Sequence, residues 1–139
     1  MTILRLDHIS VHGMPAGVEL DQMVEIGGRR LQPLKVAPQS SLPLPVAFDE
    51  AGERLAGLPR CFYEPDGSFV WVGDGWQLDG VLYDRGGELD YVELKGECSS
   101  SALDHLLDML GREERRPMFQ VMRCGVFLTE SELRRFVAS

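Results

Sequence analysis

The sequence is poor in cysteine. Its three cysteines, Cys61, Cys98 and Cys124, are an odd number, lie far apart and form no Cys-x-x-Cys pair. That distribution argues against both a disulfide framework and a zinc knuckle, and it fits a reducing compartment. We therefore expect a protein that folds without disulfides or a structural metal.

Long apolar runs are also missing. No segment approaches the roughly 20 apolar residues that a membrane-spanning helix needs. The first residues, from Met1 to Asp7, lack the basic start and the apolar run of a secretory signal. These features predict a soluble, cytoplasmic protein with no membrane association.

Basic residues are outnumbered by acidic ones. The chain has 22 aspartates and glutamates against 14 lysines and arginines, so its formal net charge is −8. A charge of this sign repels polyanions at long range, which disfavours nucleic acid as a partner. The same charge favours encounter with a cationic partner, and the partner that we expect is another protein.

What the chain does have is the composition of an ordinary globular protein, with 139 residues, 44% of them hydrophobic and 26% charged. We predict a single domain over residues 1–139. Residues 1–32 form a region of strand and hairpin, residues 33–47 a proline-rich connector, and residues 48–139 the main core. The predicted class is α+β, with a mainly antiparallel sheet of about five to six strands and two to three helices packed on it.

The strand predictions depend on alternation and on turn signals. Residues 3–11 alternate, and residues 24–31 form two short arms around a Gly-Gly pair that predicts a hairpin. Turn signals separate four further strand-like runs, at 60–64, 69–72, 76–83 and 89–95, and a short apolar run follows at 118–122. The order is typical of an antiparallel meander.

Three segments are predicted to be helical. Residues 48–55 have acidic residues early and glycine and proline beyond their end. Leucines from Leu103 to Leu110 recur at helical spacing, with Ser100 or Ser101 as the expected cap. Thr129 and Glu132 have the spacing of a capping box for a last helix.

One constellation has residue types suited to chemistry. Alternation directs Asp79 away from the leucines of its strand, and it puts Glu93 and Lys95 on one face of the next strand. A three-residue loop would pair Asp79 with Glu93 and would also set apolar beside apolar, whereas a two-residue loop would pair Asp79 with Leu94. We therefore predict that Asp79 faces Glu93. Two adjacent carboxylates can share a Mg²⁺ ion, and a nearby lysine can orient an attacking water.

At this point the sequence resembles the PD-(D/E)XK nuclease superfamily, whose hallmark is an Asp on one strand and Glu-x-Lys on the next. The resemblance covers a little over half of the chain. It implies a metal-dependent phosphodiesterase in which Asp79 and Glu93 hold the Mg²⁺ and Lys95 is the catalytic residue. It also implies that Glu50 or Glu53 adds a ligand. Leu78 stands where the family often has proline.

The alternative is that these three side chains belong to a solvated sheet face. In that case we expect no cofactor and a non-catalytic binding or regulatory module that meets another protein through its acidic surface and the aromatic hairpin around Trp71. A small-molecule pocket between the sheet and the Leu103 helix is a third possibility. His8 and His12 are four residues apart without a suitable third ligand, so we expect ordinary surface histidines. His105 is expected to be a partly exposed helix residue.

Overall fold

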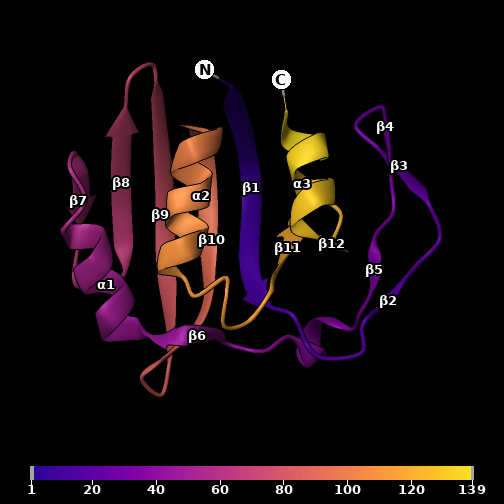
Figure 1. Ribbon diagram of the computed structural model, residues 1–139, viewed down its shortest axis with the longest axis horizontal. Helices are drawn as coiled ribbons and strands as arrows, with labels where there is room; N and C mark the ends of the chain where they lie inside the picture. Colours follow the sequence, from indigo (N-terminus) through magenta and orange to yellow (C-terminus); the bar gives the residue numbers. More distant parts are fainter. Residues whose placement is uncertain (1, 139) are drawn as a thin grey trace.

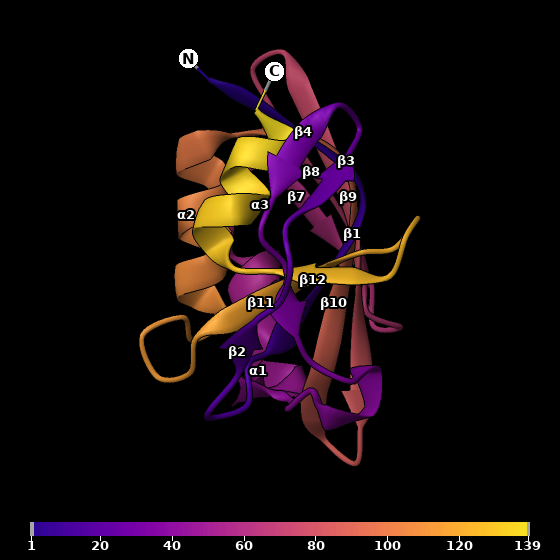
Figure 2. The same cartoon turned by 90° about the vertical axis from the view of Figure 1, so that its right-hand side faces the viewer.

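The computed structural model describes residues 2–138 as an antiparallel sheet with helices packed on one face (Figures 1 and 2). The strands lie in the order β7-β8-β9-β10-β1-β11-β12-β5-β2, and β6 pairs with β10 beside this path. A separate hairpin consists of β3 and β4. The elements in chain order are β1 (Ile3–Gly13), β2 (Glu19–Leu20), β3 (Val24–Ile26), β4 (Arg29–Leu31), β5 (Leu34–Lys35), η1 (Pro38–Ser40), β6 (Leu44–Ala47), α1 (Phe48–Ala56), β7 (Cys61–Tyr63), β8 (Ser68–Gly73), β9 (Trp76–Arg85), β10 (Glu88–Ser99), α2 (Ser100–Met109), β11 (Pro117–Val121), β12 (Val126–Leu128) and α3 (Glu130–Val137).

The predicted α+β class with a mainly antiparallel sheet is confirmed, but the predicted number of strands is wrong. Residues 2–138 form a ten-stranded sheet rather than one of five to six strands. The additional strands are short: β2 and β5 have two residues each, β12 has three and β6 has four. Such short segments show too little alternation to be recognised. Two of them, β5 and β6, lie in residues 33–47, which were expected to form a connector.

The three predicted helices correspond to α1, α2 and α3, and their caps agree only in part. Thr129 caps α3 as predicted, because its side chain accepts a hydrogen bond from the backbone N–H of Glu132 at 3.3 Å. The cap of α2 is Ser99 rather than Ser100 or Ser101, and its Oγ accepts from the N–H of Ala102 at 3.1 Å. Three serines in a row leave the first helical residue undetermined, so the sequence does not distinguish among them.

The hydrophobic core lies between the helices and the sheet. It includes Leu6 of β1, Leu31 of β4, Leu44 of β6 and Leu103 of α2, all at most 3% exposed. The predicted strand region, connector and main part therefore contribute to one shared cluster. None of the helices formed by the described residues is long and apolar enough to cross a membrane.

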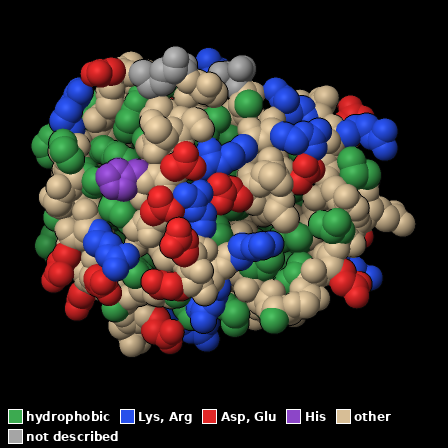
Figure 3. Space-filling view, in the orientation of Figure 1, with side chains coloured by type: hydrophobic (Ala, Val, Ile, Leu, Met, Phe, Trp, Pro, Cys, Tyr) green, Lys and Arg blue, Asp and Glu red, His purple; other side chains and the backbone are tan. Residues whose placement is uncertain are grey.

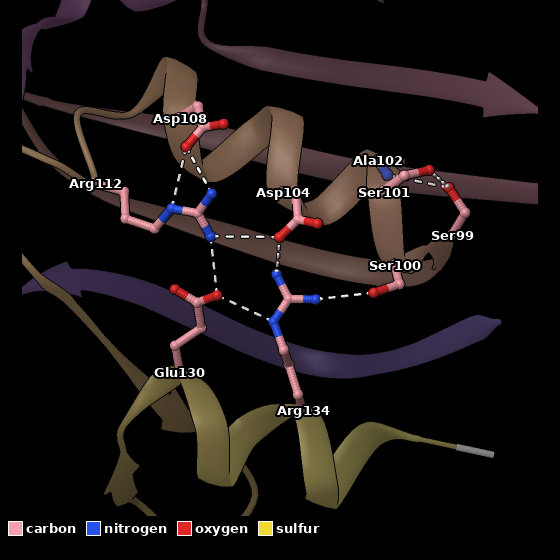
Figure 4. A network of polar contacts seen from close by, with 9 residues as sticks. All are labelled: Ser99, Ser100, Ser101, Ala102, Asp104, Asp108, Arg112, Glu130 and Arg134. Carbon is pink, nitrogen blue, oxygen red and sulfur yellow. Dashed lines mark hydrogen bonds and ion pairs between the residues drawn. The ribbon is translucent and has the colours of Figure 1, made fainter.

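On the side covered by helices, charged side chains link α2 to α3 (Figure 4). Arg112 Nη1 lies 2.9 Å from Glu130 Oε2, and Arg134 contacts both Glu130, at 3.0 Å, and Asp104, at 2.5 Å. Arg134 also donates to Ser100 Oγ at 3.0 Å. Figure 3 shows acidic and basic side chains interspersed over these helices. These ion pairs hold α2 and α3 together, and the guanidinium groups of Arg112 and Arg134 are engaged within the network.

The other face of the sheet divides into two halves. Near β11, β12 and β5, a second small cluster consists of Leu34, Met118 and Phe127, with Met14, Val18 and Val36 packed against it. Within residues 2–138, helices do not cover the other half, on strands β7 to β10 (Figure 2). We call this half the open face, and it presents the side chains of Phe62, Ser68, Val70, Val72, Gln77, Asp79, Val81, Tyr83, Tyr91, Glu93 and Lys95.

Candidate functional site

The predicted pairing of Asp79 with Glu93 is wrong. Asp79 lies opposite Lys95, and Glu93 lies opposite Val81. The hairpin turns through a two-residue loop, Gly86-Gly87, because Arg85 pairs with Glu88 and both glycines have positive φ, +62° and +92°. Positive φ at both central positions is what a tight two-residue hairpin turn of type I′ requires.

A β-bulge then shifts the register by one residue. Leu89 pairs with Asp84 but Tyr91 pairs with Tyr83, so Asp90 is the extra residue in β10. Because one residue of slip turns each side chain to the other face, the bulge returns Glu93 and Lys95 to the face that carries Asp79. The three predicted residues therefore share the open face.

The three side chains also line one depression, of about 280 Å³. Val70 and Val81 contribute its apolar surface, and Ser68 contributes a hydroxyl group. Asp79 and Glu93 are diagonal neighbours across the two strands, a relation that separates residues by about 7–8 Å on a sheet face. The depression combines two carboxylates and one ammonium group with apolar surface.

Each of the two carboxylates has partners. Asp79 Oδ1 accepts a hydrogen bond from the Gln77 side chain at 3.0 Å. Glu93 Oε2 lies 3.1 Å from His8 Nε2, and Glu93 Oε1 accepts from the Tyr83 hydroxyl at 3.5 Å. The contact with His8 does not have the geometry of a hydrogen bond.

A second bulge brings His8 to Glu93. In β1, Leu6 pairs with Gly96 and Ile9 pairs with Leu94, so Asp7 and His8 together oppose Lys95. His8 has φ +66°, a backbone conformation that is uncommon for a residue other than glycine. The irregularity explains how a histidine in a long strand comes to lie beside a carboxylate of the next strand.

His12 does not match the expectation of a surface histidine, since its side chain is buried, with 9% exposure. Its ring stacks on Tyr91 at 5.1 Å and meets the edge of Phe127 at 5.5 Å, and Tyr91 stacks on Tyr83 at 4.4 Å. Burial lowers the pKa of His12 to about 4, against a smaller opposite effect of Asp90. The imidazole is therefore neutral near pH 7.

The polar contact of His12 is with another buried group. Its Nε2 lies 2.8 Å from Ser10 Oγ, which also lies 3.2 Å from the sulfur of Met122, while Nδ1 has no hydrogen-bond partner. Ser10 is only 1% exposed, so its hydroxyl is closed to a substrate. Although it contains a serine and a histidine in contact, the cluster is a packed part of the sheet.

Other predicted participants lie elsewhere. Glu50 and Glu53 belong to α1, which packs against the face of the sheet opposite Asp79, and Glu50 pairs with Arg54 at 2.6 Å. His105 is exposed on α2, as expected, with its ring 6.3 Å from that of Trp71. Among residues 2–138, no group of three or more His, Cys, Asp or Glu side chains is placed to hold a metal ion.

The third possibility, a ligand pocket between the sheet and the Leu103 helix, has no support. Leu103, Leu106 and Leu107 are at most 1% exposed. The helix therefore packs flush against the sheet. The aromatic hairpin is also mainly core, because Trp71 is 7% exposed and meets Trp76 edge to face at 5.4 Å.

Two features of the open face were not among the candidates. Phe62 is 66% exposed and pairs with Val70, and the stacked Tyr83 and Tyr91 lie beside Glu93. Phe62, Val70, Tyr83 and Tyr91 lie on the same side of the sheet as Asp79. The alternation of side chains along each strand could have predicted this exposed apolar surface once the core side of the sheet was identified. Comparisons with known proteins found no match for this chain among family models, curated proteins or solved structures.

Proposed function

We propose that this protein is a non-catalytic binding module that acts through contacts with another protein, and that the open face makes those contacts. One observation carries the proposal. Apolar and aromatic side chains occupy positions at which an antiparallel sheet with one solvent-facing side normally has polar residues. Phe62 is exposed, and Val70, Val81, Tyr83 and Tyr91 are half-exposed.

The physical reason concerns the cost of leaving such side chains in water. Contiguous exposed apolar surface on a folded protein marks an interaction site far more often than scattered single residues do. Tyrosine is enriched at such sites because it offers a large contact area together with a hydroxyl group. The open face is also rigid, since all four of its strands are paired, so binding would order little backbone.

Affinity purification from native extract at moderate salt tests this function. The bait proteins are the wild type, a variant of the open face, Tyr83→Ala with Tyr91→Ala, and a matched control, Glu113→Gln, in an exposed loop on the other side of the molecule. We expect a partner that copurifies with the wild type and with Glu113→Gln and is lost with the tyrosine variant. A wild-type protein that stays monomeric and without a partner would contradict the proposal.

A second candidate function is a metal-dependent phosphodiesterase of the PD-(D/E)XK kind. It is supported by the depression that Asp79, Glu93 and Lys95 share. In this function the two carboxylates would hold Mg²⁺, and Lys95 would act on the attacking water. The purified protein is incubated with plasmid and single-stranded DNA and with Mg²⁺ or Mn²⁺, beside Glu93→Ala and Lys95→Ala. Cleavage that is lost in both variants supports this candidate, and equal cleavage by all three proteins ends it.

A further inference from the structure

We infer that the open face recognises a basic segment of its partner, one in which lysine or arginine accompanies apolar side chains. The inference rests on the proposed function and adds the chemistry of the partner. Its first basis is the apolar part of the face. Val70 pairs with Phe62 on one side and with Asp79 on the other, so two neighbouring apolar side chains end at a carboxylate, with Lys95 beyond it in the same row.

The second basis is charge. The open face has two carboxylates, Asp79 and Glu93, and one ammonium group, that of Lys95. Asp79 is exposed, and Glu93 keeps 27% of its side chain exposed beside the depression. The face therefore has one more acidic than basic group, and the net charge of −8 on the whole chain adds a long-range attraction for cations.

The third basis is the pair of stacked tyrosines. The Tyr83 hydroxyl donates to Glu93 Oε1 at 3.5 Å, and the pKa of Tyr83 is raised chiefly by burial and to a lesser degree by the charge of Glu93. Tyr91 stacks on Tyr83 and on His12, so Tyr83 is the tyrosine that can offer a ring face beside that carboxylate. An aromatic face near a carboxylate binds guanidinium and ammonium groups, so an arginine side chain would stack on Tyr83 while its head reaches Glu93.

Other occupants fit less well. A second copy of this chain, docked face to face, would add a surface with the same excess of acidic over basic groups. An acidic peptide or a nucleic acid would meet the same repulsion. A purely apolar segment would remove Asp79, Glu93 and Lys95 from water without adding a cation for the second carboxylate, which is costly.

Three acetylated ten-residue peptides serve as probes: alternating arginine and valine, alternating glutamate and valine, and alternating arginine and serine. Binding is measured by calorimetry at about 150 mM salt, an ionic strength that screens distant charges. We expect the arginine-valine peptide to bind, the arginine-serine peptide to bind at least about fivefold more weakly, and the glutamate-valine peptide not to bind. Equal affinity for the two arginine peptides, or binding of the acidic one, would overturn the inference.

A pair of variants with the same change in net charge locates the site. Asp79→Asn with Glu93→Gln removes both carboxylates of the open face, whereas Glu53→Gln with Glu113→Gln removes two exposed ones elsewhere. We expect the first variant to lose about fivefold in affinity, the amount that two exposed ion pairs contribute, and the second to lose less than twofold. Equal losses would mean attraction to net charge alone. Dimerisation through this face, seen by sedimentation, would also refute the inference.

The outcomes separate this inference from the proposed function. A partner from extract that depends on Tyr83 and Tyr91, together with peptides that bind without preference for arginine, would leave the function standing and refute the basic segment. Peptide binding as expected, with no partner that depends on the open face, would support the chemistry of the surface and contradict the function.

Discussion

His12 makes the fold sensitive to acid, and the size of the effect can be worked from its burial. The pKa of the imidazole is lowered from 6.5 to about 4, chiefly because the ring is buried between Tyr91 and Phe127. The unfolded chain therefore takes up a proton near pH 6.5, and the folded chain does so only near pH 4. Lowering the pH thus favours the unfolded chain, beginning near pH 6.5 and levelling off below pH 4.

The free energy at stake follows from the two pKa values. The difference between 6.5 and about 4 corresponds to at most about 3 kcal/mol of unfolding free energy, since each tenfold change in the equilibrium is worth about 1.4 kcal/mol. That loss is a large share of the roughly 5–15 kcal/mol that stabilises a typical domain. We expect this one histidine to set much of the acid limit of the protein.

Urea unfolding of the wild type and of His12→Gln, at several values between pH 7.5 and pH 4, measures the effect. Other titrating groups are common to both proteins and cancel in the difference. We expect the wild type to lose about 3 kcal/mol more than the variant over this range, and His105→Gln, which changes an exposed histidine, to follow the wild type. Parallel curves for wild type and His12→Gln would refute the assignment, as would an NMR titration that places the pKa of His12 near 6.5.

Three further predictions concern packing, capping and thiol reactivity. Gly80→Ala should destabilise the fold by about 1–3 kcal/mol, because a Cβ there would collide with the buried ring of Phe69. Gly57→Ala is the control and should change the stability little, since Gly57 has φ −82° and a Cβ there would make ordinary contacts. Thermal unfolding compares the two variants, and equal melting temperatures would contradict the collision. Ser99→Ala should lower the free energy of unfolding by about 1 kcal/mol, because it removes the cap of α2. Ser101→Ala is the control and should lower it less, since Ser99 is the residue that accepts the hydrogen bond from the helix N–H. Urea unfolding measures both variants. Iodoacetamide at pH 8 should label the exposed Cys124 first, because burial raises the pKa of Cys61 to about 11 and that of Cys98 to about 12. Mass spectrometry of the tryptic peptides gives the order of labelling, and early labelling of Cys98 would contradict this prediction.

Much of the secondary structure was predictable because long elements carry strong periodic signals. Leu103, Leu106 and Leu107 predicted α2, and turn glycines separated the strands that became β7 to β10. The short strands were not predictable, because pairing with distant neighbours rather than local pattern creates them. β5, for example, pairs with β12 only through Leu34 and Phe127, far apart in the chain.

Asp79, Glu93 and Lys95 were predicted to share a face, and they do, but the predicted pairing of Asp79 with Glu93 was wrong. His12 shows the limit of local reading more sharply. Alternation places it on the side away from the main core, where a histidine is expected to be exposed, yet Tyr91 from β10 and Phe127 from β12 close over it. Burial by residues from two other strands leaves no trace in the sequence around His12.

The bulge at Asp90 explains why the face was predictable while the partner was not. A two-residue Gly-Gly turn, continued without irregularity, would have set Asp79 beside Leu94 and turned the two strands' apolar residues to opposite sides of the sheet. Burying Leu78 and Leu82 together with Val92 and Leu94 stabilises the fold more than one regular pair of the β-ladder does. The strand therefore keeps the two-residue turn and corrects its register with an extra residue, Asp90. The hydrophobic pattern therefore determines the face of each residue, whereas the bulge determines its neighbour. Because it makes Lys95 rather than Leu94 the neighbour of Asp79, the same bulge decides which charges a partner of the open face would meet.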